Sequence, residues 1–242
     1  MKLGKRLSQI ESMVQDGYEH IWDCCCDHGL LGASLLTRKA APHIHFVDIV
    51  PALMERLENK LKQFFPQEST SEKNSAPSQW HTHCQDIATL PIDRYTGKQL
   101  IIIAGIGGDL MIEMITKIYT LYPHMELDFL LCPVLHNFRL RETLIKYRCH
   151  LQREVLVEEN HRFYEILLIS TNPIHDSSIR SITPVGEDIW STESPNQQLI
   201  AYSYLEKTIA HYQRMQTRPH TDVQTIINQY QAVRLKLIAK ID

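Results

Sequence analysis

The sequence predicts an α/β protein built on a doubly wound, mostly parallel sheet, and three observations point to this fold class. Short apolar runs of strand length alternate with amphipathic helical segments through most of residues 3–147. The run Leu100–Ala104 is apolar throughout, which is typical of a central parallel strand buried on both faces. Carboxylates or glycines follow the first four of these runs, at the positions where open α/β sheets bind ligands.

The first helix and the strands are recognised by their hydrophobic period. Leu3, Leu7, Ile10 and Val14 recur at helical spacing, so residues 3–15 are expected to form an amphipathic helix. The parallel strands are expected at residues 20–25, 43–48, 80–84, 100–104 and 127–132.

Helices are expected to connect the strands, because parallel pairing needs crossovers. Segments with helical character lie at residues 30–39, 51–65, 109–122 and 137–147. Pro51 suits the first turn of its helix, where the N–H that proline lacks would have no partner. Residues 66–79 are rich in Ser, Pro and Glu and have no apolar period, so we expect a flexible surface insertion there instead of a domain boundary.

The pattern changes after the last of these helices. Residues 154–158 and 163–169 are strand-like runs separated by only a few residues around Asn160. That gap is too short for a helical crossover, so the two runs are expected to form an antiparallel hairpin. A mostly parallel seven-stranded sheet that ends in such a hairpin is the class I methyltransferase variant of the Rossmann-like fold, whereas a plain Rossmann dehydrogenase continues with parallel strands.

The C-terminal part has a different organisation. Residues 172–196 are irregular, and two apolar stripes at helical spacing follow, from Leu199 to Met215 and from Val223 to Ile241, with Pro219 between them. We expect an α-helical hairpin there. The predicted division is a Rossmann-like catalytic domain over residues 1–172, and an irregular linker with the helical hairpin over residues 173–242.

The composition is that of an ordinary globular protein. The 242 residues carry a formal net charge of −3, whereas nucleic-acid-binding domains usually have a basic footprint. Basic residues gather only locally, within residues 139–153 and 207–240, and either form solvated helix faces or contact phosphates. No run approaches the roughly 20 apolar residues of a membrane span, and no signal-peptide core follows the N-terminus, so a cytoplasmic location is expected.

Polar groups at the expected strand ends match the functional groups of S-adenosyl-L-methionine. Asp48, after the second strand, suits the ribose diol, and Asp86, after the third, suits the adenine amine. Gly105 and Gly107, after the fourth, permit close backbone approach to the aminoacyl end. Each aspartate taken alone has a helix N-cap as its alternative role.

A metal site and a cysteine nucleophile are two alternative functions for residues at the same positions. A metal site would combine residues such as Cys24, Cys26 and His28 with His81 and His83, but these spacings do not match zinc sites, and no metal is expected. Cys25 has no evident paired base nearby, so a buried inert thiol is favoured over a nucleophile. The six cysteines are expected to be reduced, and the 13 scattered histidines to lie at the surface or in hydrogen-bonded core positions.

Four motifs resemble one family, the bacterial tRNA (adenine-22-N1)-methyltransferases, over nearly the whole chain. Leu3–Leu7 resembles the opening Leu-Ser-x-Arg-Leu, and Asp23–His28 resembles the cofactor loop Asp-Ile-Gly-Ser-Asp-His. Ile103–Gly108 matches Ile-Ala-Gly-Met-Gly-Gly, and Tyr164 with Glu165 matches a Tyr-Glu pair in the last hairpin. The chain departs from the family in having Cys25 at a glycine position, and Cys-Pro-Val at residues 132–134 in place of Gln-Pro-Asn.

The resemblance implies methyl transfer from S-adenosyl-L-methionine to N1 of an adenine in tRNA. The expected cofactor-binding residues are Asp23, Cys25, Gly29, Asp48, Ile49, Asp86, Ile87, Ala104, Gly105, Ile106 and Gly107. Asp27 and His28 are the catalytic candidates. The expected substrate-binding residues are Arg6, Pro133, Arg139, Arg141 and Tyr164. The alternatives are a methyltransferase for another RNA, a protein or a small molecule, and a non-catalytic module that binds the cofactor or RNA.

Overall fold

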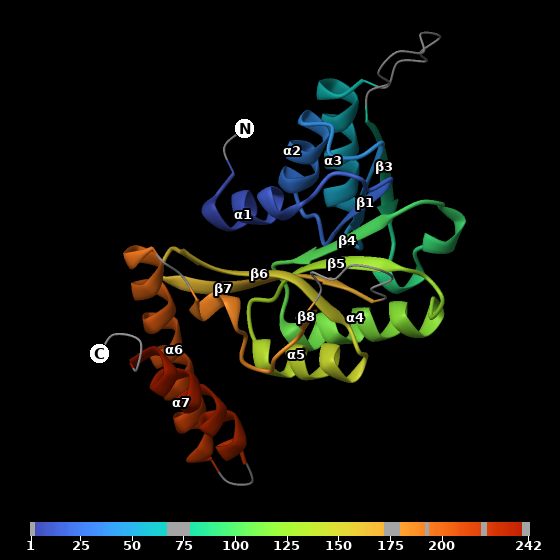
Figure 1. Cartoon of the computed structure of the whole chain (residues 1–242). Coiled ribbons are helices and arrows are strands. Elements are labelled where there is room, and N and C mark those ends of the chain that lie inside the picture. Colours follow the sequence, from blue (N-terminus) through green and yellow to red (C-terminus); the bar gives the residue numbers. More distant parts are fainter. Residues whose placement is uncertain (1–2, 67–77, 172–179, 192–193, 219–221, 239–242) are drawn as a thin grey trace.

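One mixed sheet organises the chain in the computed structural model, which describes residues 3–66, 78–171, 180–191, 194–218 and 222–238 (Figure 1). Within these residues the sheet has eight strands in the order β3-β2-β1-β4-β5-β7-β6-β8. The seven expected strands are all present. The additional strand, β8 (Arg180–Ser181), has only two residues and pairs with the outer strand of the hairpin.

The parallel and antiparallel parts of the sheet lie where the sequence predicts them. The parallel strands are β1 (His20–Cys24), β2 (His43–Asp48), β3 (Gln79–Cys84), β4 (Gln99–Ala104) and β5 (Leu127–Cys132). The hairpin strands, β6 (His150–Glu159) and β7 (Arg162–Ser170), are longer than expected, and β7 inserts antiparallel between β5 and β6. β1, β4 and β5 are the most deeply buried strands, and the apolar run Leu100–Ala104 in β4 agrees with this position.

Helices cover both faces of the sheet (Figure 1). One face carries α1 (Lys5–Met13), α2 (Leu30–Thr37) and α3 (Pro51–Phe64), and the other carries α4 (Gly108–Leu121) and α5 (Asn137–Lys146). Two short 3₁₀ turns, η1 (Ile87–Thr89) and η2 (Ile92–Arg94), connect β3 to β4. Two apolar cores result, one on each face.

The expected helical hairpin is also present, as α6 (Pro195–Gln216) and α7 (Gln224–Ile238), preceded by the 3₁₀ turn η3 (Asp188–Trp190). It shares a third core with the rest of the chain, because Tyr204 and Tyr230 pack with Phe138 of α5 and Leu156 of β6. Among the described helices, none is long and apolar enough to cross a bilayer. Most of the expected insertion (residues 67–77), part of the irregular segment (172–179 and 192–193), Pro219 and Ile241 lie outside the described residues.

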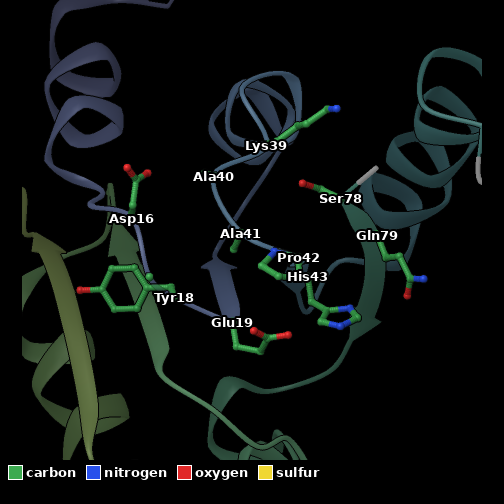
Figure 2. A pocket seen from close by; sticks show the side chains of 11 residues that line it. Asp16, Tyr18, Glu19, Lys39, Ala40, Ala41, Pro42, His43, Ser78 and Gln79 are labelled. Carbon is green, nitrogen blue, oxygen red and sulfur yellow. The ribbon is translucent and has the colours of Figure 1, made fainter. Parts of the chain in front are cut away.

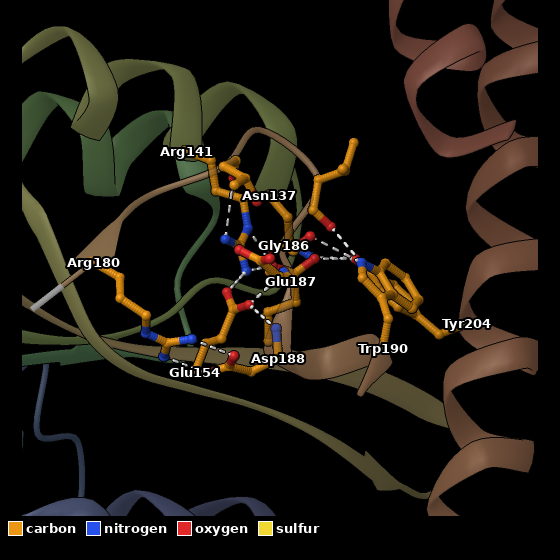
Figure 3. A network of polar contacts seen from close by, with 12 residues as sticks. Asn137, Arg141, Glu154, Arg180, Gly186, Glu187, Asp188, Trp190 and Tyr204 are labelled. Carbon is orange, nitrogen blue, oxygen red and sulfur yellow. Dashed lines mark hydrogen bonds and ion pairs between the residues drawn. The ribbon is translucent and has the colours of Figure 1, made fainter. Parts of the chain in front are cut away.

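A buried ion cluster joins the β6–β7 hairpin to the C-terminal helices (Figure 3). The guanidinium of Arg141 on α5 is fully buried, 2.6 Å from Glu154 Oε2 and 2.7 Å from Glu165 Oε2. The other oxygen of Glu165 accepts a hydrogen bond from the hydroxyl of Tyr204 on α6. The other oxygen of Glu154 accepts the backbone N–H groups of residues 187–188, at 2.6 and 2.7 Å. Each carboxylate therefore has partners for both oxygens, which buried charges require.

Five histidines gather on the face of β1, β2 and β3 that lies beside η1 and η2. His45 is fully buried, and its ring nitrogens lie 3.1 Å from Nδ1 of His20 and 2.9 Å from Nε2 of His83. His43 and His81 form a second pair at 3.2 Å. A neutral imidazole both donates and accepts one hydrogen bond, so His45 satisfies both contacts without a charge.

The environment of His45 disfavours its protonated form. The rings of Trp22 and Tyr95 lie against it, with centroid distances of 3.8 and 4.9 Å. Burial, followed by the charges of the neighbouring histidines, lowers the pKa of His45 to about 2. The same causes lower the pKa of His20, His81 and His83. His45 and these three neighbours are therefore neutral in the folded protein at physiological pH.

The ion cluster gives the first prediction. Arg141→Met should lower the free energy of unfolding by about 3–5 kcal/mol, because two carboxylates then stay buried without their cation. Arg139→Met on the same helix is the matched control, since Arg139 is exposed and pairs only with the exposed Asp109, an interaction worth about 1 kcal/mol or less. Urea unfolding at neutral pH measures both variants, and equal losses would contradict the role given to Arg141.

The histidine cluster gives the second prediction. As pH falls below 6.5, the ordinary histidine pKa, the unfolded chain takes up protons that folded His45 excludes, so stability decreases. Above that pH the imidazole is neutral in both states and contributes no pH dependence. The contribution of His45 should reach about 1.4 kcal/mol per pH unit on the acidic side. His45→Gln should therefore make the pH dependence of unfolding less steep below pH 6.5.

Urea unfolding at several pH values between about 5 and 7.5 measures this difference. The comparison of slopes between wild type and variant cancels the contributions of other titrating groups. His124→Gln is the control because His124 is exposed, and its slope should equal that of the wild type. An unchanged slope in His45→Gln would show that His45 is not kept neutral by the fold.

Candidate active site

A cavity of about 200 Å³ lies at the carboxyl ends of β1 and β4, next to the start of α1. Eight of the predicted site residues line it: Arg6, Asp23, Cys25, Asp27, His28, Ala104, Gly105 and Ile106. The strand order explains this grouping, because β1 and β4 are neighbours and their loops leave the sheet at the same edge. Two cysteines and three leucines complete the lining: Cys24, Cys26, Leu7, Leu30 and Leu31.

The loop between β1 and α2 forms one wall of the cavity through an unusual backbone. Cys25, Asp27 and Gly29 all have left-handed conformations, with φ of 58°, 50° and 68°. The N–H of Gly29 donates to the carbonyl of Cys26 at 2.7 Å, which closes the turn at the start of α2. A Cβ on Gly29 would lie 2.4 Å from Leu57 Cδ1, so the left-handed conformation favours glycine and any other residue would also displace the Leu57 side chain.

Asp48 ties this loop to the end of β2. Its Oδ2 accepts the backbone N–H of Asp27 at 3.1 Å, and its Oδ1 accepts the N–H of Val50 at 3.1 Å. Ile49, the next predicted cofactor contact, is 68% exposed beside it. The end of β2 thus presents a carboxylate and an exposed apolar side chain next to the cavity.

Asp23 is a buried carboxylate within the cavity wall. Its Oδ2 accepts the N–H of Gly32 at 2.9 Å, in the first turn of α2. Burial, aided by the nearby charge of Asp48 and opposed by the Gly32 hydrogen bond, raises the pKa of Asp23 to about 7. A positively charged ligand in the cavity would favour its ionised form.

Cys25 lies among the carboxylates of three strand ends. Burial, followed by the charges of Asp48, Asp23 and Asp86, raises the pKa of its thiol to about 11. The thiol therefore stays protonated at neutral pH, which argues against a nucleophilic role. In the described part of the chain, no group of three or more histidine, cysteine or acidic residues is arranged to hold a metal ion.

At the end of β3, Asp86 Oδ1 accepts the N–H of Ala88 at 2.9 Å and so caps η1. This is the capping role that the sequence left open for each aspartate. Ile87 is 3% exposed and packs in the core below the turn, whereas of the other two predicted isoleucines Ile49 is exposed and Ile106 is half-buried in the cavity wall.

Two joined turns form the opposite side of the cavity. The N–H of Gly105 donates to the carbonyl of Cys132 at 3.1 Å, and the N–H of Val134 donates to the carbonyl of Ile106 at 2.9 Å. Gly107 has no atom within 4 Å of the position its Cβ would take, which leaves its backbone accessible. Pro133 is buried, and the side chains that this turn exposes are Val134 and Leu135.

The catalytic candidates lie at the mouth of the cavity. His28 Nε2 is 3.6 Å from Asp27 Oδ1, and the two side chains are 57% and 66% exposed. Their exposure leaves room for a substrate to contact both. Tyr164, half-buried on β7, faces the same region because its ring lies against the guanidinium of Arg6.

The predicted substrate role of Arg141 is wrong. Its side chain is fully buried in the ion cluster with Glu154 and Glu165, so it has no access to a nucleic-acid phosphate. Arg139, two residues earlier and on the exposed side of α5, is accessible, although it pairs with Asp109 at 2.8 Å.

The remaining lining residues were not predicted as site residues. Leu7 belongs to the apolar stripe of α1, and Leu30 and Leu31 open α2, so helical periodicity shows them as packing residues and gives no sign of a site.

A larger depression lies at the opposite edge of the sheet, at the amino ends of β1 and β2 (Figure 2). It has a volume of about 580 Å³ and includes Asp16, Glu19, Lys39 and His43. None of the predicted cofactor residues lies there, and ligands of doubly wound sheets bind at the carboxyl ends. The smaller cavity is therefore the candidate active site.

Comparisons with known proteins agree with this fold. Residues 3–167 match the family model described as a methyltransferase domain. No curated protein gives a match. A putative tRNA (m1A22) methyltransferase from Streptococcus pneumoniae, solved in complex with S-adenosyl-L-methionine, has a TM-score of 0.71 and 20% identity, covering 98% of this chain and 100% of that one.

Two further solved structures are similar over their whole length. TrmK of M. capricolum, in complex with S-adenosyl-homocysteine, has a TM-score of 0.68 and 16% identity, with 98% of each chain covered. The m1A22 tRNA methyltransferase TrmK of B. subtilis has a TM-score of 0.65 and 18% identity, covering 99% of this chain and 98% of that one. At these identities the likeness establishes the fold alone.

Proposed function

Because the chain belongs to the methyltransferase domain family, we propose that it transfers a methyl group from S-adenosyl-L-methionine to N1 of an adenine in tRNA. The observation that carries the proposal is the cavity at the ends of β1 and β4, which Asp23, Asp27 and the turn at Gly105 line and whose β1–α2 loop is bound by Asp48. The similar solved structures described as tRNA m1A22 methyltransferases, with S-adenosyl-L-methionine or S-adenosyl-homocysteine bound in two of them, support it. Because its proposed substrate is tRNA, we propose that the protein is cytoplasmic.

The residues of the cavity and of the neighbouring ends of β2 and β3 fit the proposed cofactor. Asp48 would take the ribose hydroxyls, Asp86 would take the adenine amine, and the exposed Ile49 would lie against the adenine ring. The open backbone at Gly107 and the turn at Gly105 admit the aminoacyl end. A buried carboxylate, Asp23, and the accessible backbone of the β1–α2 loop complete a site suited to a ligand with positive charge.

In the proposed reaction the protein acts mainly by positioning the adenine next to the methyl group of the cofactor. When bound, the cofactor supplies a methyl group already activated by the sulfonium charge. The target adenine leaves its stack in the RNA and enters the mouth of the cavity, between the Asp27–His28 pair and Tyr164. Asp27 accepts a hydrogen bond from the exocyclic amine, which stabilises the positive charge that develops as N1 is methylated, and His28 orients this contact.

We propose that the outer faces of α5, α6 and α7 bind the RNA. Their exposed cations are Arg139, Lys146, Lys207, Arg214 and Lys236, and the exposed Arg218 follows the end of α6. We propose that residues 1–172 carry the cofactor site and residues 173–242 serve the substrate. Because α6 and α7 share a core with α5 and β6, surface substitutions test this division better than truncation.

Methyl transfer to tRNA is the direct test of the function. The purified protein with S-adenosyl-L-methionine should convert one adenosine of unmodified tRNA to 1-methyladenosine, detected by nucleoside mass spectrometry. A tRNA transcript with guanine at position 22, the position that the family resemblance implies, should not be methylated. Methylation of another RNA, a protein or a metabolite, without a tRNA product, would overturn the substrate, and cofactor binding without any turnover would indicate a non-catalytic module.

The ribose assignment gives a separate prediction. Asp48→Ala should weaken S-adenosyl-homocysteine binding by about 1.5–3 kcal/mol, the range for hydrogen bonds to charged groups. Isothermal titration calorimetry measures the affinity, and urea unfolding confirms that the variant is folded. Asp109→Ala, an exposed aspartate outside the cavity, is the control and should bind normally. Normal affinity in a folded Asp48→Ala variant would rule out this ribose contact.

A further inference from the structure

Arg6, in the first turn of α1, brings a guanidinium group into the cavity. Its Cζ lies 5.0 Å from the centroid of the Tyr164 ring on β7. A Cβ placed on Gly105 would lie 3.5 Å from Nη1 and 3.7 Å from Nη2 of Arg6. The guanidinium therefore sits directly over the end of β4, at van der Waals distance from the Cβ position of Gly105.

This guanidinium has no anionic partner among the described residues. Nε of Arg6 is buried without a hydrogen bond, and no described carboxylate lies within the 4.0 Å of an ion pair. Glu159 accepts the backbone N–H of Arg6 at 3.4 Å and not its side chain. The half-buried guanidinium is stabilised by the Tyr164 ring but has no counter-ion, so its position favours an anion supplied by a ligand.

We propose that Arg6 binds the carboxylate of the aminoacyl end of S-adenosyl-L-methionine, an inference that rests on the proposed function. The sheet order places Asp48 of β2 and Gly105 of β4 on opposite sides of β1. A ligand whose ribose is held at Asp48 and that crosses the β1–α2 loop therefore brings its other end to Gly105. Arg6 covers that position.

The charges of the cavity agree with this orientation. The aminoacyl end of the cofactor has one carboxylate close to an ammonium group and the sulfonium. The cavity offers the carboxylates of Asp23 and Asp27, which attract the two cationic groups and repel the carboxylate. Arg6 supplies the matching positive charge, and its planar fork can donate two parallel hydrogen bonds to a carboxylate.

An RNA phosphate is the competing anion for Arg6, and the sequence alone favoured such a substrate contact. Arg6 is half-buried and shares its cavity with Asp23, which is 4% exposed. The exposed cations Lys207 and Arg214 lie instead on the outer surface of α6. The depth of Arg6 favours a small ligand that enters the cavity over a phosphate of a folded RNA.

Two ligands that differ only in the carboxylate test the assignment. Calorimetry should compare S-adenosyl-homocysteine with its decarboxylated analogue, which keeps the amine, in the wild type and in Arg6→Met and Arg6→Lys variants. Arg6→Met should weaken S-adenosyl-homocysteine binding about 10- to 100-fold and change the affinity of the analogue less than about threefold. Arg6→Lys, which keeps the charge, should recover part of the loss. Lys5→Met, an exposed neighbour on α1, should bind both ligands normally.

The outcomes separate this proposal from the function it rests on. Equal losses for the two ligands, or normal S-adenosyl-homocysteine affinity in Arg6→Met, would overturn the role of Arg6 while the cofactor assignment stands. Normal cofactor affinity combined with weaker tRNA binding in Arg6→Met would show that Arg6 binds the tRNA substrate instead. A wild-type protein that binds neither ligand would overturn both the cofactor and the role of Arg6.

Discussion

The buried charge of Arg141 is the constraint on which the C-terminal half of the fold depends. Its guanidinium is stable in the interior only with Glu154 and Glu165 in place, so α5, the hairpin and, through Tyr204, α6 must meet at one point. Neighbouring residues of a strand point to opposite faces of the sheet. The contacts that hold Glu165 on one face of β7 therefore also place Tyr164 on the other, against the guanidinium of Arg6.

The cofactor loop depends on a second constraint, the shape of its backbone. Left-handed conformations at Cys25 and Asp27 cost about 1–2 kcal/mol each. The loop keeps them because Asp48 accepts the N–H of Asp27 and the Cys26 carbonyl accepts that of Gly29. A wall held in this way is formed before a ligand arrives, so binding pays little conformational entropy for ordering it.

Sequence patterns were sufficient for most of the fold, because its strands and helices have a clear hydrophobic period. β2 and β5 have the expected bounds, and the cofactor-site motifs meet at one cavity. The two-residue β8 is too short to show a period.

The role of Arg141 was predicted wrongly because helical arginines are usually solvated, although its spacing from Phe138 and Leu144 places it on the buried face of α5. The histidine pairs alternate along β2 and β3, but their contacts depend on strand order, which local patterns do not show.

The pairing of β1 with β4 has a consequence for how the chain folds. His20 of β1 pairs with Gln99 of β4, so this contact closes a long loop and forms slowly compared with the local β6–β7 hairpin. During synthesis, one edge of β1 has no partner until the ribosome has released β4. The loop that follows β1 gains its opposite wall only at that stage, so the nascent protein acquires its binding cavity late, after β2 and β3 have already been made.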